Sequence, residues 1–151
     1  LAESRNPLRV SMMPADVLPL HAPAGSKAIL SFLCVGQINK LINDKHTGDE
    51  LEPYCANTIT SKEELHRKLI EYNKQGYSID NEELYPGIYA LGVPIFDYLS
   101  KPIAALVAVM PISRVTNERI AEIVCEMRKT SKFIAEQVNQ KRSLFPYHTS
   151  N

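Results

Sequence analysis

Two short stretches of the chain carry residues that could bind a small charged molecule. The first is an acidic cluster, Asp80, Glu82 and Glu83, which lies just before an apolar segment. A carboxylate in this place can accept hydrogen bonds from a ligand hydroxyl, bind a hydrated carbonyl, or hold a protonated carboxyl group. Charge at the rim of an apolar surface is typical of small-molecule pockets. The alternative is a solvated acidic loop, because most acidic side chains of a protein are exposed.

The second stretch is Ala24, Gly25 and Ser26, which follow Pro23 at the start of an expected helix. The first N–H groups of a helix have no partner inside it and lie at the positive end of its dipole, so they can bind a carboxylate. Small side chains also let a ligand approach the backbone closely. The alternative is a plain helix start packed on a neighbour. The next residue, Lys27, is interpreted as a structural or surface lysine rather than a ligand contact.

Hydrophobic periodicity predicts the elements that position these residues. Residues 76–114 are predicted to form strand, acidic loop, strand, turn and strand, because Ile88–Phe96 and Ile103–Met110 are short apolar runs rich in β-branched residues. Residues 97–101 form a polar break of hairpin size, and Pro102 is admissible at a strand start. A further short strand is expected at residues 7–13, closed by Pro14, and residues 46–58 are expected to be loop.

Four helices are expected around these strands. The tetrapeptide 60–63, Thr-Ser-Lys-Glu, fits a capping box that opens a helix at Thr60, and Gly76 ends that helix. The others are expected from Ala24 to residue 33, over 37–42, and from Thr116 to about Asn139. Helices around antiparallel strands predict an α+β domain with a central antiparallel sheet.

Length and composition exclude several classes of protein. At 151 residues the chain is one domain, and its 44% hydrophobic and 23% charged residues are ordinary for a globular protein. With 17 basic and 17 acidic residues it has no net charge, so the chain itself is not expected to bind DNA. It has no apolar run of ~18 residues and no signal peptide, which favours a cytoplasmic protein without membrane contact.

The sequence shows no motif for metal binding or nucleophilic catalysis. Cys34, Cys55 and Cys125 are far apart and lack metal-like spacing to a histidine, so we expect no metal and interpret them as buried or indifferent thiols. No serine or cysteine is paired with a histidine by motif, and no glycine-rich phosphate loop is present. We therefore expect neither enzymatic activity nor a cofactor.

Five motifs in collinear order resemble one family. They are P-L-H-A-P-A-G-S-K-A-I-L-S-F-L, Y-C-A-N-T-I-T, G-Y-S-I-D-N-E-E, G-I-Y-A-L-G-V-P-I-F-D and A-A-L-V-A-V-M-P-I-S-R-V-T. Over residues 7–138 the chain resembles the C-terminal effector-binding domain of isocitrate-lyase-regulator-type (IclR-type) transcription factors. The resemblance implies a GAF-like domain over residues 1–140. Residues 141–151 are expected to be a C-terminal tail, because they are polar and contain Pro146. The resemblance also implies a DNA-binding winged helix N-terminal to this chain, through which operator DNA is bound, and a homodimer or homotetramer.

The resemblance places both candidate stretches in the effector site. In the family an aspartate matching Asp80 lies in that site, and backbone amides matching Ala24 and Gly25 hold the effector carboxylate. The usual A-x-x-x-G-K-A pattern is here A-P-A-G-S-K-A, with Pro23 and Ser26 as departures. The backbone amides survive these changes, so the site is retained in the prediction.

The expected pocket wall is apolar. Members of the family that bind very small polar acids tend to carry Cys or Ser where this chain has Ala90, Val107 and Val109. Together with Ile88 these residues predict a pocket for an aromatic or branched monocarboxylic acid, because the hydroxyls of a small polar acid would be buried unpaired there. The alternative is that they are only sheet core. The same two possibilities apply to Tyr85, Tyr89, Met12, Met13 and His21.

The sequence therefore predicts the ligand-sensing, oligomerising domain of a transcriptional regulator, in which a small carboxylic acid modulates operator binding. One alternative is a GAF-like redox enzyme of the thiol-based sulfoxide reductase type, which requires two cysteines to converge, one with a lowered pKa. A nucleotide or cofactor sensor is a second alternative.

Overall fold

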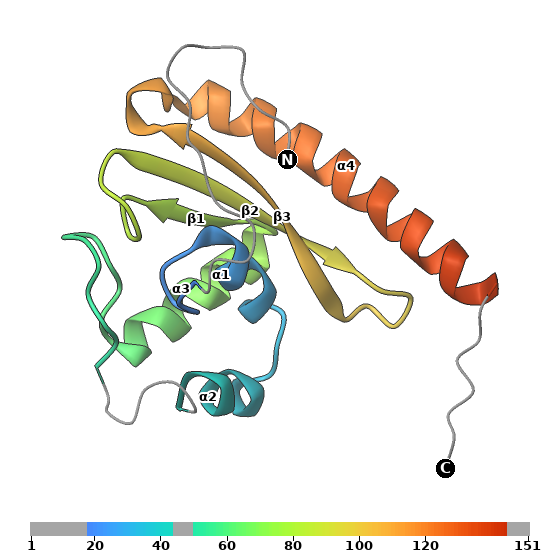
Figure 1. Cartoon of the computed structure of the whole chain (residues 1–151), viewed down its shortest axis with the longest axis horizontal. Helices are drawn as coiled ribbons and strands as arrows, with labels where there is room; N and C mark the ends of the chain where they lie inside the picture. Colours follow the sequence, from blue (N-terminus) through green and yellow to red (C-terminus); the bar gives the residue numbers. More distant parts are fainter. Residues whose placement is uncertain (1–17, 44–49, 145–151) are drawn as a thin grey trace.

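A three-stranded antiparallel sheet forms the centre of the domain (Figure 1). The computed structural model describes residues 18–43 and 50–144, with side chains as far as residue 140. The strands are β1 (Ser78–Asn81), β2 (Ile88–Phe96) and β3 (Pro102–Pro111), in the spatial order β1-β2-β3. The strand, loop, strand, turn and strand predicted over residues 76–114 are confirmed. The strand expected at residues 7–13, and with it Met12 and Met13, lies outside the described residues.

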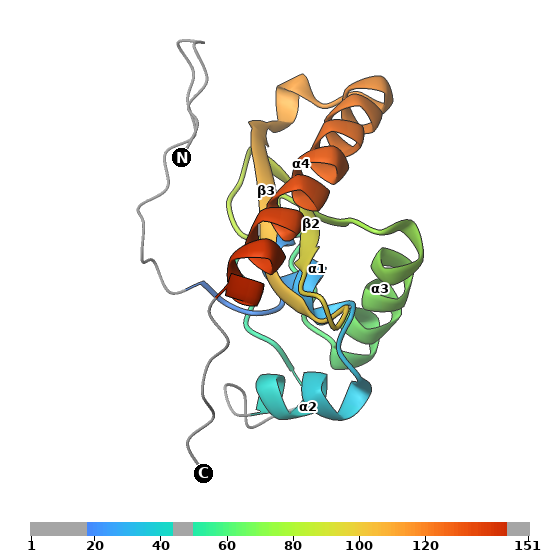
Figure 2. The same cartoon turned by 90° about the vertical axis from the view of Figure 1, so that its right-hand side faces the viewer.

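Helices cover both faces of this sheet, which confirms the α+β, GAF-like fold. Figure 1 shows α4 (Asn117–Leu144) on one side of the sheet, and α1 (Ala24–Leu30) and α3 (Lys62–Gln75) on the other. In Figure 2, turned by 90°, α4 crosses in front of β2 and β3. Helix α2 (Val35–Asn43) lies at the far end of the α1–α3 layer, and a single 3-10 turn, η1 (Ile112–Arg114), connects β3 to α4.

Helix ends follow local chemistry, with small differences from the prediction. The N-cap of α3 is Ser61, whose Oγ accepts a hydrogen bond from the Glu64 N–H at 3.2 Å, so the helix begins one residue later than a Thr60 cap would place it. Gly76 ends it with a φ of 75°, as predicted, because glycine adopts this left-handed conformation without a steric cost. Helix α1 ends at Leu30, before residue 33, and α4 continues past Asn139 to Leu144.

Strand register assigns each residue of the sheet to one face. Ser78 lies opposite Gly92, which lies opposite Val107, and Asp80 forms the next such row with Ala90 and Val109. Side chains directly opposite each other in an antiparallel pair point to the same face. Both rows, and Ile88 beyond them, therefore share the face that α1 covers, and the intervening residues point toward α4.

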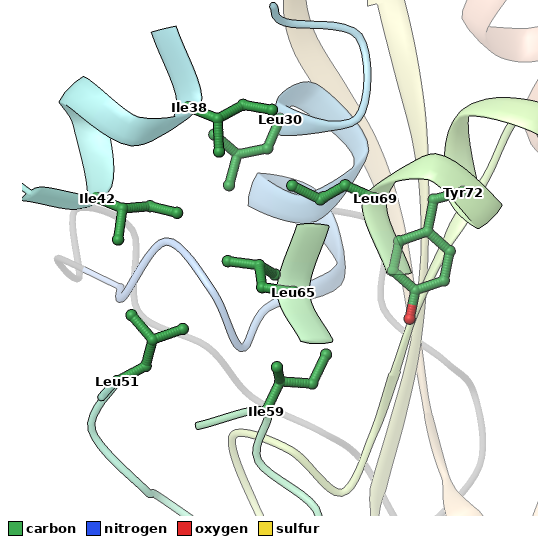
Figure 3. Packing of buried hydrophobic residues seen from close by; sticks show 8 residues of the cluster. All are labelled: Leu30, Ile38, Ile42, Leu51, Ile59, Leu65, Leu69 and Tyr72. Atoms are coloured by element: carbon green, nitrogen blue, oxygen red, sulfur yellow. The ribbon is translucent and has the colours of Figure 1, made fainter. Parts of the chain in front are cut away.

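Two apolar clusters form the core. The first joins α1, α2 and α3 with the segment that precedes α3 (Figure 3); its buried members are Leu30, Ile38, Ile42, Leu51, Ile59, Leu65, Leu69 and Tyr72. The second lies between the sheet and α4, with buried members Tyr89, Leu91, Val93, Met110, Val124 and Met127. Large side chains fill both clusters. The contact between α1 and the sheet, in contrast, is made of small residues.

Two glycines bring the start of α1 into close contact with the sheet. A Cβ placed on Gly92 would lie 2.5 Å from the carbonyl oxygen of Ala24, and one on Gly25 would lie 2.9 Å from Cγ2 of Val107. The hydroxyl of Ser78 donates a hydrogen bond of 2.5 Å to the same Ala24 carbonyl. The first turn of α1 thus lies directly on the row formed by Ser78, Gly92 and Val107.

Candidate functional site

The start of α1 presents backbone donors at the surface of the sheet. Pro23 is the N-cap and provides no side-chain hydrogen bond to the first turn. The first helical N–H bonded within the turn is that of Lys27, which donates to the Pro23 carbonyl at 3.2 Å. The Ser26 hydroxyl turns back to the same carbonyl at 3.1 Å, so Ser26 offers its amide rather than its side chain. These amides can take an anion.

Asp80 is buried on the same face, and it belongs to an ordered turn. Asp80 and Glu83 are only 4% and 6% exposed, so the alternative of a solvated acidic loop is wrong for these two residues. The Oδ1 atom of Asp80 accepts the Glu83 N–H at 2.8 Å and lies 3.4 Å from the Leu84 N–H. Burial raises the pKa of the Asp80 carboxyl, while the Glu83 N–H bond and the charge of Lys27 oppose that rise.

Glu83 forms a buried ion pair with Lys27. The Lys27 Nζ lies 2.5 Å from Glu83 Oε2, and Lys27 is 0% exposed. Burial raises the pKa of Glu83 to about 7, against the stabilising charge and hydrogen bond of Lys27. Burial also lowers the pKa of Lys27, an effect that Glu83 opposes. The interpretation of Lys27 as structural fits this position, but no local pattern of residues indicates that Glu83 is its partner.

The acidic turn is also tied to the segment that precedes α3. The Thr58 hydroxyl donates to the Glu83 carbonyl at 2.5 Å, and the Asn57 amide donates to the Asn81 carbonyl at 3.1 Å. Glu82 has a φ of 55°, which is unusual for a residue with a side chain, and its carboxylate accepts the Gly87 N–H at 2.7 Å. These bonds hold Asp80 and Glu83 in one geometry.

The predicted apolar wall runs along the same face in successive rows. Ala90 is buried, Ile88 and Val109 are half-buried, and Val107 is 42% exposed. Rows two residues apart along a strand are separated by about 7 Å. Ala24, Gly25, Asp80 and this wall therefore come together on the α1 face.

In the part of the chain that the structure describes, two grooves lie on the opposite face of the sheet, beside α4. One of about 780 Å³ is lined by residues that include Tyr77, Tyr89, Val124 and Arg128. The other, of about 490 Å³, includes Leu106, Ile123 and Met127, together with Val107 at the sheet edge.

Several further candidates do not join the α1 face. Tyr89 points toward α4 and belongs to the core there, and Tyr85 is exposed. His21 is buried, with its Nε2 2.9 Å from the Glu52 carbonyl oxygen, which fits the structural interpretation.

The cysteines were interpreted as buried or indifferent thiols, and burial is wrong for two of them. Cys34 and Cys125 are exposed, because each lies on the solvent side of its helix region, and Cys55 is half-buried. Cys34 directly precedes α2, Cys55 lies in the segment before α3, and Cys125 is on α4, across the sheet from α1. Within the described part of the chain, no three His, Cys, Asp or Glu side chains are placed to hold a metal ion. No described helix is long and apolar enough to cross a membrane.

An α+β domain with this sheet order and with a small-residue helix start on one sheet face has close structural relatives. The C-terminal domain of the transcriptional regulator KdgR from E. coli superimposes with a TM-score of 0.73 at 30% identity, over 80% of this chain and 71% of that one. A double mutant of the PobR inducer-binding domain from Acinetobacter, solved with 3-hydroxybenzoic acid, gives a TM-score of 0.69 at 25% identity, over 78% and 66%.

Sequence comparison agrees. Residues 2–136 match the family described as bacterial transcriptional regulator IclR C-terminal. The transcriptional repressor IclR of Escherichia coli (strain K12) is 35% identical over 125 residues, which cover 83% of this chain and 44% of that protein. The chain belongs to the IclR family of bacterial transcriptional regulators. It spans about half the length of the curated relatives it matches.

Proposed function

We propose that this domain senses a small monocarboxylic acid on the α1 face of its sheet. The observation that carries the proposal is the start of α1, whose amides lie against the Gly92 row, with the buried Asp80 one row away. Binding would modulate operator affinity through a DNA-binding domain outside this chain, in a homodimer or homotetramer. We expect no catalysis, and nothing in the placement of the three cysteines supports the redox alternative.

The charges of the site orient the ligand. An anion prefers the amides of Ala24, Gly25 and Ser26, because the positive end of the helix dipole lies there, and it would be repelled from Asp80. The carboxylate of the acid is therefore assigned to α1. A hydroxyl or hydrated carbonyl at its other end can donate to the Asp80 carboxylate.

The body of the ligand would lie along Ile88, Ala90, Val107 and Val109. These side chains offer no hydrogen bond, so a polar group placed there would lose its partners. An aromatic or branched acid suits this wall better than glyoxylate. The PobR domain solved with 3-hydroxybenzoic acid supports the choice, since that ligand has a carboxylate, an aromatic ring and one hydroxyl.

The test uses four acids, benzoate, 3-hydroxybenzoate, 3-methyl-2-oxobutanoate and glyoxylate, in thermal unfolding and titration calorimetry. An acid at a hundredfold its dissociation constant should stabilise the fold by about 2.7 kcal/mol. The neutral analogue 3-hydroxybenzamide should give no shift, because the α1 amides would have no anion to bind.

A substitution at Asp80 then tests the second contact. Asp80→Asn keeps an acceptor for the Glu83 N–H but removes the charge, so it should weaken 3-hydroxybenzoate by about 1 to 3 kcal/mol and leave benzoate nearly unchanged. Glu136→Gln, on the exposed surface of α4, is the control and should leave both affinities unchanged. If the amide binds as well as the acid, or if Asp80→Asn leaves 3-hydroxybenzoate unaffected, the site is not as proposed.

A further inference from the structure

We infer that the buried Lys27–Glu83 ion pair is a positioning element of the effector site, which holds the α1 amides at a set distance from Asp80 and balances the charge of a bound acid. The inference rests on the proposed function. It concerns two side chains that would not touch the ligand and that belong to neither of the predicted contacts.

The pair joins the two halves of the site through short, ordered connections. Lys27 closes the first turn of α1 by donating its N–H to Pro23, so its side chain is anchored in the same turn as the amides that would bind the acid. Glu83 donates its N–H to the Asp80 carboxylate at 2.8 Å. A shift of either partner of the ion pair would therefore change the distance between the amides and Asp80.

Stability alone gives a weak reason for this pair. Moving two ions out of water is costly, and apolar side chains of similar size are often as stable in the same place. Here Lys27 is fully buried and Glu83 nearly so, and the Glu83 carbonyl is additionally held by the Thr58 hydroxyl at 2.5 Å. Such an arrangement defines a geometry more strongly than it adds stability.

The charges around Glu83 are not balanced by Lys27 alone. Asp80 faces the pair from β1 and Tyr72 from α3, while Lys68 of α3 acts on Lys27. Two buried carboxylates thus lie near one ammonium group, which is bonded to Glu83 alone. A third carboxylate, brought by the effector, disfavours the ionised form of Glu83 further. Binding is then expected to take up a proton.

The direction in which affinity depends on pH follows from this proton uptake. In the free domain burial raises the pKa of Glu83 to about 7, and a bound acid raises it more. Affinity should be highest and constant below pH 7, and should fall as pH rises from 7 to the pKa of the complex. Proton uptake should be largest within that interval.

Calorimetry in buffers of different ionisation enthalpy measures this uptake directly, with the tightest binder of the four acids as the probe. The wild-type chain should take up part of one proton between pH 7 and 8. Glu83→Gln keeps an acceptor for Lys27 but cannot titrate, so it should bind the acid without proton uptake. Glu136→Gln, on the exposed surface of α4, should behave as wild type.

The positioning role is tested by the double variant Lys27→Met with Glu83→Leu, whose folding is checked by cooperative thermal unfolding. Its affinity for the acid should fall by about tenfold or more, equivalent to about 1.4 kcal/mol. If the double variant does not fold, the loss of proton uptake in Glu83→Gln decides the question.

Wild-type binding without proton uptake, uptake that persists in Glu83→Gln, or a folded double variant with wild-type affinity would each overturn the inference and leave the proposed function standing. If none of the four acids binds the wild-type chain, the proposed function fails, and this inference fails with it.

Discussion

The two faces of the sheet are made by the same strands, yet their side chains differ in size and charge. Leu91 and Gly92 are neighbours in β2 and therefore belong to opposite faces of the sheet. On the α4 face Leu91 packs among other large apolar residues, whereas on the α1 face Gly92 leaves room for the backbone of Ala24. The α4 face thus buries volume, and the α1 face brings helix amides and buried charges together.

The grooves do not coincide with the buried charges. The groove of about 780 Å³ on the α4 face has cationic side chains, but Arg128 donates to the Gln75 carbonyl and lies over the Tyr77 ring. Lys129 in the same groove is paired with Glu126 at 2.6 Å. The proposal places the acid on the α1 face because its backbone donors lie beside a buried carboxylate that can select the other end of the ligand.

The largest expected effect is on the α4 face. Leu91→Ala removes a fully buried side chain and should lower the free energy of unfolding by about 2 to 5 kcal/mol. Urea unfolding measures it, with the exposed Val35→Ala as a control that should change stability by about 0.5 kcal/mol or less. Affinity of the folded variant for the acid should be unchanged. A Leu91→Ala cost below about 1 kcal/mol would contradict the comparison of the two faces.

Gly92→Ala tests the α1 face. The added methyl group would lie 2.5 Å from the Ala24 carbonyl oxygen, so α1 must move away, and a cost of about 1 to 3 kcal/mol is expected. Because the amides move with α1, acid binding should be lost as well, which Leu91→Ala should not cause.

Gly36→Ala is the matched control for this substitution. Gly36 lies in α2 with nothing within 4 Å of an added Cβ, so the change should stabilise the domain by about 0.4 to 1 kcal/mol. Wild-type affinity in Gly92→Ala would show that the position of α1 does not matter for binding.

The elements could be predicted from the sequence because their signals are local. Apolar runs bounded by Pro, Gly and Asp gave β2 and β3, and the polar residues 97–101 gave the turn between them. The helix ends could not be predicted to the residue, because Thr60 and Ser61 are both good caps and only the bond to Glu64 selects Ser61. The end of α1 depends on how the chain turns toward α2, which periodicity does not encode.

The site was predictable in its parts but not in its connections. Asp80 and the small residues after Pro23 are recognisable because of their neighbours in the sequence. The ion pair between Lys27 and Glu83 joins residues 56 positions apart, so only the folded chain reveals it. The exposure of Cys125 likewise depends on which side of α4 faces the sheet, and a helix with a broad apolar stripe leaves that choice open.

Among the substitutions on the α1 face, the smallest expected change in stability is at Val107, where the effect should appear in ligand preference. Val107 is 42% exposed and lies under Gly25, so Val107→Ser should cost less than about 1 kcal/mol of stability. The substitution would place a hydroxyl beside the α1 amides and remove apolar surface from the wall. The ratio of glyoxylate to benzoate affinity should rise by about tenfold, the worth of one net hydrogen bond.

Ile103→Ser, at 40% exposure on the same strand, is the control and should leave the ratio unchanged. An unchanged ratio in Val107→Ser, measured by calorimetry with both acids, would mean that the ligand does not lie against this part of β3.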